Sequence, residues 1–412
     1  MARENRINDA AQGYVDRKQF SGIEWRVEAK GSALTAGQVG SPGANVSGPI
    51  PEDAIYRIYS MTKPIVSVMA LILIEQGKLR LYDMLAQYNP AFRNMRVLLP
   101  SGELAPAQRP ILVEDLLTHR AGVTYEFIAG CHIAPGYDAM DIAADGQCSL
   151  DEMMAKLAAQ PLAFQPGTQF RYSVCTDVLA HVCEKASGRT MQSLLQEHIL
   201  QPLNMVDTDY YVPEEKQSRL MPMFGISDVA EMSFLNPPLV QELIVSDVEE
   251  MYPSSNPAYS RGGHGLFSTT DDYFKFGKML LDGKSPSGDA VISRKMLEMM
   301  LFNRIPPEQL PLRIGMNALQ GYGWGLGVRI MLDPGQARSL TGKGEFGWAG
   351  AASTYFWVDP NEEMVGVIMT QYLGSILPLA DDMRAAAYQM LDSHSALAGV
   401  SICLYAWSGR YT

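Results

Sequence analysis

The sequence has few of the residues that tie small or metal-dependent folds together. Its 412 residues include five cysteines, with no Cys-x-x-Cys pair, and six histidines, with no His-Glu-x-x-His group. Disulfide frameworks and zinc sites use closely spaced ligands, so we expect reduced thiols, no metal site and no cofactor. Reduced thiols are typical of the cytosol, which predicts a cytoplasmic protein.

Long apolar runs and basic charge are also scarce. The longest apolar run, residues 64–74, is too short to span a bilayer, and residues 1–20 are polar and charged, unlike a signal peptide. The formal net charge is −12 and the pI is about 5.0. An acidic surface argues against partners such as nucleic acid or an anionic membrane. We therefore expect a soluble globular protein whose partner is a small molecule, in an oligomeric state that the sequence does not define.

Strand patterns occur near both ends of the chain. Residues 7–19 predict a helix, and residues 23–29 and 34–39 predict two strands joined by a turn. A helix is also predicted late in the chain, over residues 376–391. Four strands are predicted before that helix, at residues 323–330, 339–344, 352–358 and 364–371. Strands from both ends can form one sheet, with the middle of the chain as an insertion.

The middle of the chain has helical patterns at residues 113–118, 150–159, 176–187 and 191–199. Residues 205–257 are rich in proline and methionine and predict pocket-shaping loops, with a disordered linker as the alternative. We predict an α/β (α+β) fold, with a discontinuous sheet domain at 1–85 and 256–395 and a mostly helical domain at 86–255. The tail at 396–412 fits a further strand, a packing tail or a remnant from cloning.

Ser60 and Lys63 form a Ser-x-x-Lys motif at a predicted helix start. Pro64 has no N–H and fits the first turn of a helix, and the helical pattern runs on to Gly77. Residues three apart share one helix face, so we expect Lys63 beside Ser60. A serine becomes nucleophilic when a base takes its proton. The motif alone is weak evidence for catalysis, because a serine that caps a helix, followed by a solvated lysine, has the same spacing.

Five blocks in and around this motif resemble the serine β-lactamase, penicillin-binding protein and esterase superfamily, most closely its class C-like branch. They are residues 56–63, 75–83, 113–122, 164–173 and 262–269, in the order of that family. The resemblance implies a β-lactamase-like fold, in which helices flank an antiparallel sheet, and a serine acyl-enzyme.

The same resemblance assigns roles in catalysis. It implies that Ser60 is the nucleophile and that Lys63 and Tyr172 are the general base and acid, without fixing which of them is the principal base. It also implies that the backbone N–H groups of Ser60 and Ala351 form the oxyanion hole, because such N–H groups stabilise the negative oxygen of the intermediate.

Two positions depart from the β-lactamase pattern. Val174 stands where the Tyr-x-Asn motif has asparagine, and Trp348, in Trp348-Ala349-Gly350, stands where a Lys-Thr-Gly strand has its cation. This pattern resembles the family VIII carboxylesterases and places Trp348 and Gly350 in the substrate-binding site. Both changes remove polar recognition of a lactam and suit a neutral ester.

Several apolar or aromatic residues are candidates for the substrate pocket. They are Tyr125, which we take as substrate-binding, and Phe127, Tyr137, Met232 and Phe234, for each of which core packing is the competing interpretation.

We therefore predict a carboxylesterase that acts on short-chain acyl esters, with a weak β-lactamase side activity. A β-lactamase or D-amino-acid peptidase, a lovastatin-synthase-like acyltransferase and a non-catalytic binding protein are the alternatives. The chain has no Gly-x-Ser-x-Gly, which excludes an α/β-hydrolase elbow. A histidine base at His119 or His264 is a further, less favoured reading.

Overall fold

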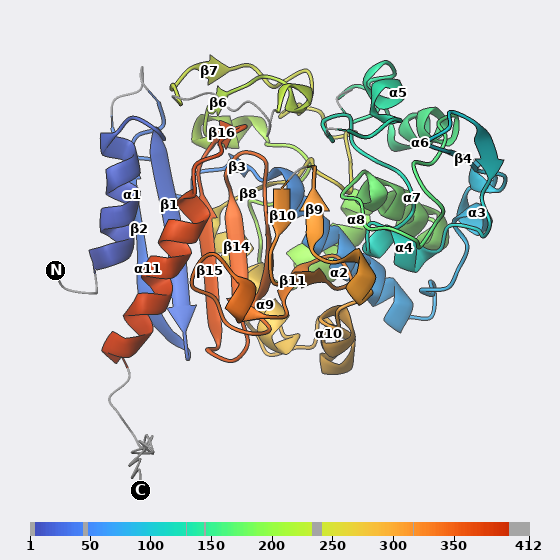
Figure 1. Cartoon of the computed structure of the whole chain (residues 1–412). Coiled ribbons are helices and arrows are strands. Elements are labelled where there is room, and N and C mark those ends of the chain that lie inside the picture. The colour runs from blue at the N-terminus through green and yellow to red at the C-terminus, as the bar shows by residue number, and fades with distance from the viewer. Residues whose placement is uncertain are drawn as a thin grey trace, which may run out of the picture.

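Both ends of the chain contribute strands to one antiparallel sheet of seven strands, in the order β11-β12-β13-β14-β15-β1-β2 (Figure 1). The computed structural model describes residues 5–43, 48–128, 130–143, 146–232, 241–315 and 317–394. The strands are β1 (Gly22–Ala29), β2 (Ser32–Gly40), β11 (Tyr322–Trp324), β12 (Arg329–Met331), β13 (Phe346–Ala349), β14 (Tyr355–Asp359) and β15 (Met364–Met369). The join between the two ends is the β1–β15 pair, where Trp25 lies opposite Ile368. The predicted fold class is confirmed.

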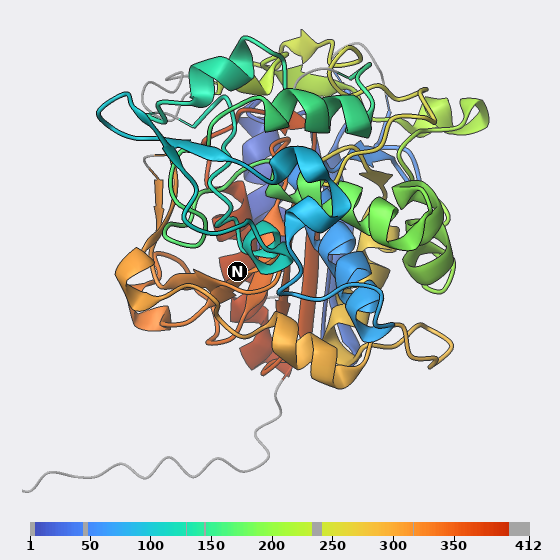
Figure 2. The same ribbon diagram turned by 90° about the vertical axis from the view of Figure 1, so that its right-hand side faces the viewer.

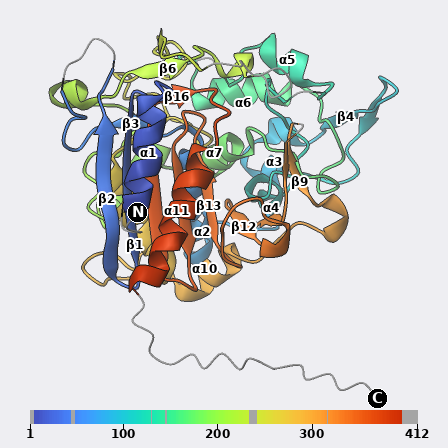
Figure 3. The same ribbon diagram turned by 60° about the vertical axis from the view of Figure 1, so that its left-hand side comes forward.

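One face of the sheet is covered by the two terminal helices, α1 (Arg6–Asp16) and α11 (Leu379–His394), which lie side by side (Figures 1 and 3). Tyr14 of α1 donates a 2.6 Å hydrogen bond to Asp382 of α11. Successive side chains of a strand point to opposite faces, so Met364 and Ile368 of β15 face these helices.

The other face of the sheet packs against the core that holds α2 (Thr62–Glu75) and α9 (Thr270–Asp282). Val365 and Val367 of β15 point to this side. Every residue of α2 from Thr62 to Leu73 is buried. A helix that is apolar all round belongs to a protein core, so the segment that carries Ser60 and Lys63 runs through the middle of the molecule.

The helical part of the chain packs on the far side of α2 (Figure 2). Its helices are α3 (Leu85–Tyr88), α4 (Val113–Leu117), α5 (Ala134–Asp138), α6 (Leu150–Ala158), α7 (Cys175–Ser187) and α8 (Met191–Leu195), and β4 (Arg96–Leu98) and β5 (Leu104–Pro106) form a hairpin beside them. The remaining helix, α10 (Arg294–Met300), follows α9. The predicted domain boundaries stay a prediction.

Short strands outside the seven-stranded sheet form further pairs. β16 (Tyr372–Leu373), β6 (Met223–Gly225) and β7 (Val245–Ser246) form a three-stranded sheet, and β3 (Tyr56–Arg57) pairs with β8 (Phe267–Ser268). β9 (Leu312–Ile314) and β10 (Asn317–Leu319) form a separate hairpin. The loops predicted at 205–257 therefore contain β6 and β7, which are anchored to β16.

Two predicted strands are wrong. The strand predicted at 323–330 is two strands, β11 and β12, because Gly327 has a φ of +99°, which an extended strand does not allow. The strand predicted at 339–344 is a loop that ends at Gly344, with a φ of +85°, before β13 begins. The tail at 396–412 lies outside the described residues. Within the ranges that are described, no helix is long and apolar enough to cross a membrane.

Candidate active site

Ser60 lies in the turn that leads into α2. A 3-10 turn, Tyr59–Met61, precedes α2, and Pro64 is in the first helical turn, as its missing N–H predicts. Tyr59 has a φ of +42°, a left-handed conformation that is strained for a residue with a side chain. Its ring packs at 4.8 Å from the ring of Tyr252. Packing thus holds the strained turn that presents Ser60 to the adjoining pockets.

Lys63 is buried directly beside Ser60. Only 1% of its surface is exposed, and its Nζ lies 3.0 Å from Ser60 Oγ. The same ammonium donates to the hydroxyl of Tyr125 at 2.9 Å and to the carbonyl of Gly263 at 2.7 Å. These three contacts use all three N–H groups of an ammonium, so Lys63 has one defined position against the serine.

Tyr172 also packs against Lys63. Lys63 Nζ is 4.8 Å from the centre of the Tyr172 ring, a cation–π distance. The Tyr172 hydroxyl accepts a 3.0 Å hydrogen bond from the indole N–H of Trp348 on β13. Ser60, Tyr172 and Trp348 line one pocket together. The structure therefore gathers three predicted site residues, Lys63, Tyr172 and Trp348, around Ser60.

Two histidines lie near this group, and neither contacts Ser60. His119 packs at 4.8 Å from the Tyr172 ring, and its Nδ1 is 3.3 Å from Ser173 Oγ. Burial, with the charge of Lys63, lowers the pKa of His119 well below its usual value. His264 Nε2 is 2.7 Å from the Tyr259 hydroxyl, and burial lowers its pKa as well. Among the described residues, no histidine is hydrogen-bonded to Ser60, so the histidine base is not supported.

The end of β13 approaches the segment before Ser60 closely because residue 350 is glycine. A Cβ on Gly350 would lie 2.4 Å from the carbonyl oxygen of Ile58 and 2.1 Å from Thr354 Oγ1. The close approach places Ala351 next to Ser60, and these two residues line both pockets that flank the serine. Among the described residues, the Ala351 N–H has no backbone hydrogen-bond acceptor.

Ser60 lies between a small pocket and a large one. The small pocket, about 40 Å³, contains Tyr125, Phe127 and Met232, together with Met251 and His264. The large pocket, about 280 Å³, is lined by Tyr172, Trp348 and Gly350 and by apolar residues that include Ile314, Ile376 and Leu377. Of the other predicted pocket residues, Tyr137 is fully buried and is not part of either lining. Phe234 lies outside the described residues.

Sequence reasoning missed three parts of the site. It did not place the Tyr125 hydroxyl on Lys63, it did not use the carbonyl of Gly263, and it passed over Asp177. Gly263 belongs to the block at 262–269 that resembles the family, so the sequence pointed to this segment but not to its carbonyl group. Asp177, in the first turn of α7, was signalled only by its charge.

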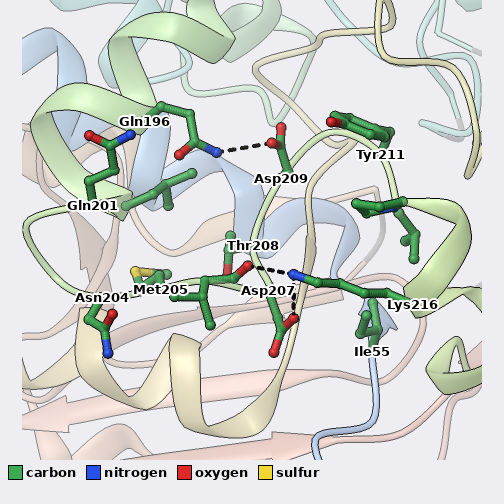
Figure 4. Close-up of a pocket in the computed structure, with 14 residues that line it drawn as sticks. Ile55, Gln196, Gln201, Asn204, Met205, Asp207, Thr208, Asp209, Tyr211 and Lys216 are labelled. Atoms are coloured by element: carbon green, nitrogen blue, oxygen red, sulfur yellow. Dashed lines mark hydrogen bonds and ion pairs between the residues drawn. The ribbon is translucent and has the colours of Figure 1, made fainter.

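A separate pocket of about 320 Å³ lies away from Ser60 (Figure 4). Its carboxylates already have partners. Asp207 pairs with Lys216 at 2.8 Å and with Arg219 at 2.6 Å, and Asp209 accepts from Gln196 at 2.9 Å. These contacts stabilise the local loops, and we assign the pocket no catalytic role.

The antiparallel sheet, the buried helix α2 and the Ser60–Lys63 pair define a serine hydrolase of the β-lactamase superfamily. A model of the Beta-lactamase family matches residues 7–390. The chain belongs to this family, which confirms the relationship expected from its sequence blocks.

Individual relatives cover most of the chain. Protein Rv1367c of Mycobacterium tuberculosis (strain ATCC 25618 / H37Rv) is 30% identical over 365 residues, 87% of each chain. Esterase EstB of Burkholderia gladioli is 28% identical over 356 residues, 82% of this chain and 83% of that one. The structure of EstCE1, described as a hydrolase with promiscuous acyltransferase activity, superposes with a TM-score of 0.78 at 22% identity, over 94% of this chain and 98% of the other. This last likeness concerns the fold.

Proposed function

We propose that the protein is a carboxylesterase of the family VIII type that hydrolyses short-chain acyl esters through an acyl-enzyme on Ser60. The observation that carries the proposal is the 3.0 Å contact between Ser60 Oγ and the buried Nζ of Lys63. A serine hydroxyl with a positioned amine beside it is the arrangement that nucleophilic catalysis needs.

The proposed reaction has two halves. In the first, Lys63 in its neutral amine form, assisted by Tyr172, takes the proton of Ser60 while Oγ attacks the ester carbonyl, and the N–H groups of Ser60 and Ala351 hold the oxyanion. Tyr172 passes its proton to the leaving alcohol and takes back the proton held by Lys63, and the acyl group stays on Oγ. In the second half, water attacks the acyl carbonyl, its proton returns through the same groups to Ser60, and the acid leaves.

The positions of the two tyrosines suggest which pocket takes which half of the ester. Tyr172, the proposed proton donor to the alcohol, lines the large pocket, and Tyr125 lines the small one. The alcohol then lies in the large pocket and the acyl group in the small pocket of about 40 Å³. A single water needs about 10–15 Å³ on this measure, so the small pocket has room for roughly three heavy atoms of an acyl chain.

The charge of the two pockets favours esters over β-lactams. Neither lining contains a lysine or arginine among the described residues, so a β-lactam carboxylate has no cation to pair with there. Trp348 occupies the place of that cation and offers an indole N–H that already bonds Tyr172. An apolar pocket with a few polar groups suits a neutral substrate.

The test compares wild type with Ser60→Ala on p-nitrophenyl butyrate and on nitrocefin. We expect the variant to lose at least about 1,000-fold in kcat on the ester, because the covalent path is removed. We expect wild type to turn over nitrocefin far more slowly than the ester. Full ester turnover by Ser60→Ala would sink the proposal, and a higher kcat/KM for nitrocefin would favour a β-lactamase.

Acyl transfer is the second candidate activity. The large pocket, about 280 Å³, can hold an acceptor alcohol after the first alcohol has left, and the structural relative EstCE1 is described as having promiscuous acyltransferase activity. Addition of a short alcohol to the assay should give a new ester alongside the acid. If the acid is the only product at high alcohol concentration, this second activity is ruled out.

We also propose a cytoplasmic location. Cys131, Cys175 and Cys183 are buried free thiols, and free thiols are typical of a reducing compartment.

A further inference from the structure

Asp177 is a buried carboxylate that binds the backbone of the active site. It lies in the first turn of α7 and is completely buried. Its Oδ1 accepts hydrogen bonds from two consecutive backbone N–H groups, from Gly262 at 3.0 Å and from Gly263 at 2.9 Å. Hydrogen bonds from backbone N–H groups to an ionised carboxylate are stronger than those to a neutral oxygen, so the two bonds attach this segment to α7.

The same segment touches the catalytic lysine. The carbonyl oxygen of Gly263 accepts a 2.7 Å hydrogen bond from Lys63 Nζ, the shortest of the three contacts made by that ammonium. Asp177 and Lys63 are thus joined through one residue, whose N–H faces the carboxylate and whose C=O faces the ammonium. A shift of Gly263 would move the acceptor that fixes Lys63 against Ser60.

The packing at this point leaves no room for a side chain on either glycine. A Cβ on Gly263 would lie 2.3 Å from Asp177 Oδ2 and 2.8 Å from the Tyr125 hydroxyl. A Cβ on Gly262 would lie 1.9 Å from the carbonyl oxygen of Thr176. The glycine pair is therefore required for the loop to reach α7, and Asp177 and Tyr125 enclose Gly263 closely.

The second carboxylate oxygen, Asp177 Oδ2, is buried and has no hydrogen-bond partner within the described ranges. Burial raises the pKa of Asp177, while the charge of Lys63, the two backbone N–H groups and the charge of Arg261 act in the opposite direction. A buried polar group without a partner is costly. An apolar side chain at this position of α7 would avoid that cost. Packing therefore does not explain the carboxyl group, whereas its hydrogen bonds to the two glycine N–H groups do.

We propose that Asp177 is a positioning residue for catalysis: by holding the N–H groups of Gly262 and Gly263, it keeps the Gly263 carbonyl on Lys63 and so keeps Lys63 on Ser60. The inference rests on the proposed function, because it takes Lys63 as the group that exchanges a proton with Ser60. Asp177 itself touches neither Ser60 nor either of the two pockets.

The first experiment compares Asp177→Ala with Asp177→Asn in the full-length protein. Active sites are counted by titration with a serine-directed phosphonate, so that misfolded molecules do not enter kcat. We expect Asp177→Ala to lose about 100-fold in kcat per titrated serine, the cost of a small displacement of a catalytic group. KM for p-nitrophenyl butyrate should stay within about twofold of the wild-type value, because the substrate pockets are unchanged.

Asp177→Asn is the rescue variant. Its side-chain oxygen can still accept from both glycine N–H groups, so we expect kcat per titrated serine within about tenfold of wild type. If Asp177→Ala matches wild type, or if Asp177→Asn is as poor as Asp177→Ala, the proposed positioning through the glycine pair is wrong.

Two further variants keep the test decisive if Asp177→Ala does not fold. Gly263→Ala forces a methyl group against Asp177 Oδ2 and should lower kcat well below the value of Asp177→Asn; equal kcat values for these two variants would contradict the proposal. Asp272→Asn is the matched control, because Asp272 is also buried and accepts a backbone N–H, from Asp207 at 2.8 Å, away from the site. It should keep kcat within about twofold. Full activity in Ser60→Ala would contradict the proposed esterase function itself, so that failure is distinguishable from failure of the positioning role of Asp177.

Discussion

The indole N–H of Trp348 donates a 3.0 Å hydrogen bond to the hydroxyl oxygen of Tyr172. The two rings are 5.2 Å apart, and the Trp348 ring also packs edge-on at 4.6 Å against Trp324. The donor orients the phenol oxygen and stabilises negative charge on it, without placing a full positive charge in the substrate pocket. In the proposed mechanism, Trp348 therefore supports proton transfer by Tyr172 and leaves the pocket suited to neutral esters.

Loss of this hydrogen bond should lower turnover. In Trp348→Phe we expect kcat on p-nitrophenyl butyrate to fall about tenfold, the effect of removing one hydrogen bond of ordinary strength. Trp324→Phe is the matched control, because its N–H bonds the carbonyl of Leu117 at 3.1 Å instead. Steady-state kinetics should show the loss of kcat in the first variant only. An unchanged kcat with a raised KM would mean that Trp348 contributes to substrate binding and has no part in proton transfer.

The two tyrosines beside Lys63 should differ in their effect on catalysis. Burial holds the pKa of Tyr125 well above its usual value, and its hydroxyl already accepts from Lys63 at 2.9 Å, so Tyr125 stays a neutral phenol. We expect Tyr172→Phe to lower kcat by about 100- to 1,000-fold, as for a general acid–base residue. Tyr125→Phe should cost about tenfold, the value of a hydrogen bond. A larger loss of kcat in Tyr125→Phe than in Tyr172→Phe would mean that Tyr125, and not Tyr172, transfers the proton.

Enlarging the small pocket should lengthen the acyl chain that the protein accepts. Met251 lines that pocket and is buried. In Met251→Ala we expect the ratio of kcat/KM for p-nitrophenyl octanoate to that for the butyrate to rise about tenfold, within the range that one or two methylenes contribute. Ile376 lines only the large pocket, so Ile376→Ala should leave this ratio unchanged. If both variants shift the ratio alike, the assignment of the acyl group to the small pocket is wrong.

Residue 350 should tolerate no side chain. The Cβ of Gly350→Ala would lie 2.4 Å from the Ile58 carbonyl oxygen, so β13 must move away from the serine segment and take the Ala351 N–H with it. We expect a loss of about 1–3 kcal/mol in the free energy of unfolding, as for an overpacked site, and a lower kcat in the folded fraction. In the exposed turn at Gly335, a Cβ would meet only Asp333 Oδ1, at 3.1 Å, and Gly335→Ala should change neither. Denaturant titration gives the free energy of unfolding and steady-state kinetics gives kcat for both variants. Equal values for Gly350→Ala and Gly335→Ala would contradict the prediction.

Glu126 should make stability depend on pH. Burial raises the pKa of Glu126 to about 7, and its carboxylate oxygens have no partner on another described residue. Since the folded value lies above the unfolded one, the contribution of Glu126 to stability is complete below about pH 4.5 and is lost as the pH rises through about 7. The unfolding free energy of wild type minus that of Glu126→Gln should therefore fall by about 3 kcal/mol between pH 4.5 and pH 8.

The control for this pH series is Glu215→Gln, because Glu215 is exposed. Its difference from wild type should stay flat over the same pH range. A flat difference for Glu126→Gln as well would mean that Glu126 is hydrated in the folded protein.

Local patterns predicted much of the fold. Residues that restrict or release φ explain the turn between β1 and β2, the start of α2 two residues before Pro64 and its end near Gly77. Such effects act within a few positions of the chain. The strand predicted at 339–344 failed because an alternating pattern in a glycine-rich loop resembles an edge strand. Whether such a segment pairs depends on partners elsewhere in the chain, and the nearby Glu345 is instead buried against Arg384 at 3.0 Å.

The sequence by itself determined the Ser60–Lys63 spacing, because three residues along a helix fix two side chains on one face. Its ordered blocks also identified the family and led to Tyr172 and Trp348. Only the tertiary structure decided that Tyr125, Gly263 and Asp177 complete the surroundings of Lys63. These three residues come from separate segments that are distant along the chain, and packing of α7 and the glycine loop against α2 brings them together, which no local pattern encodes.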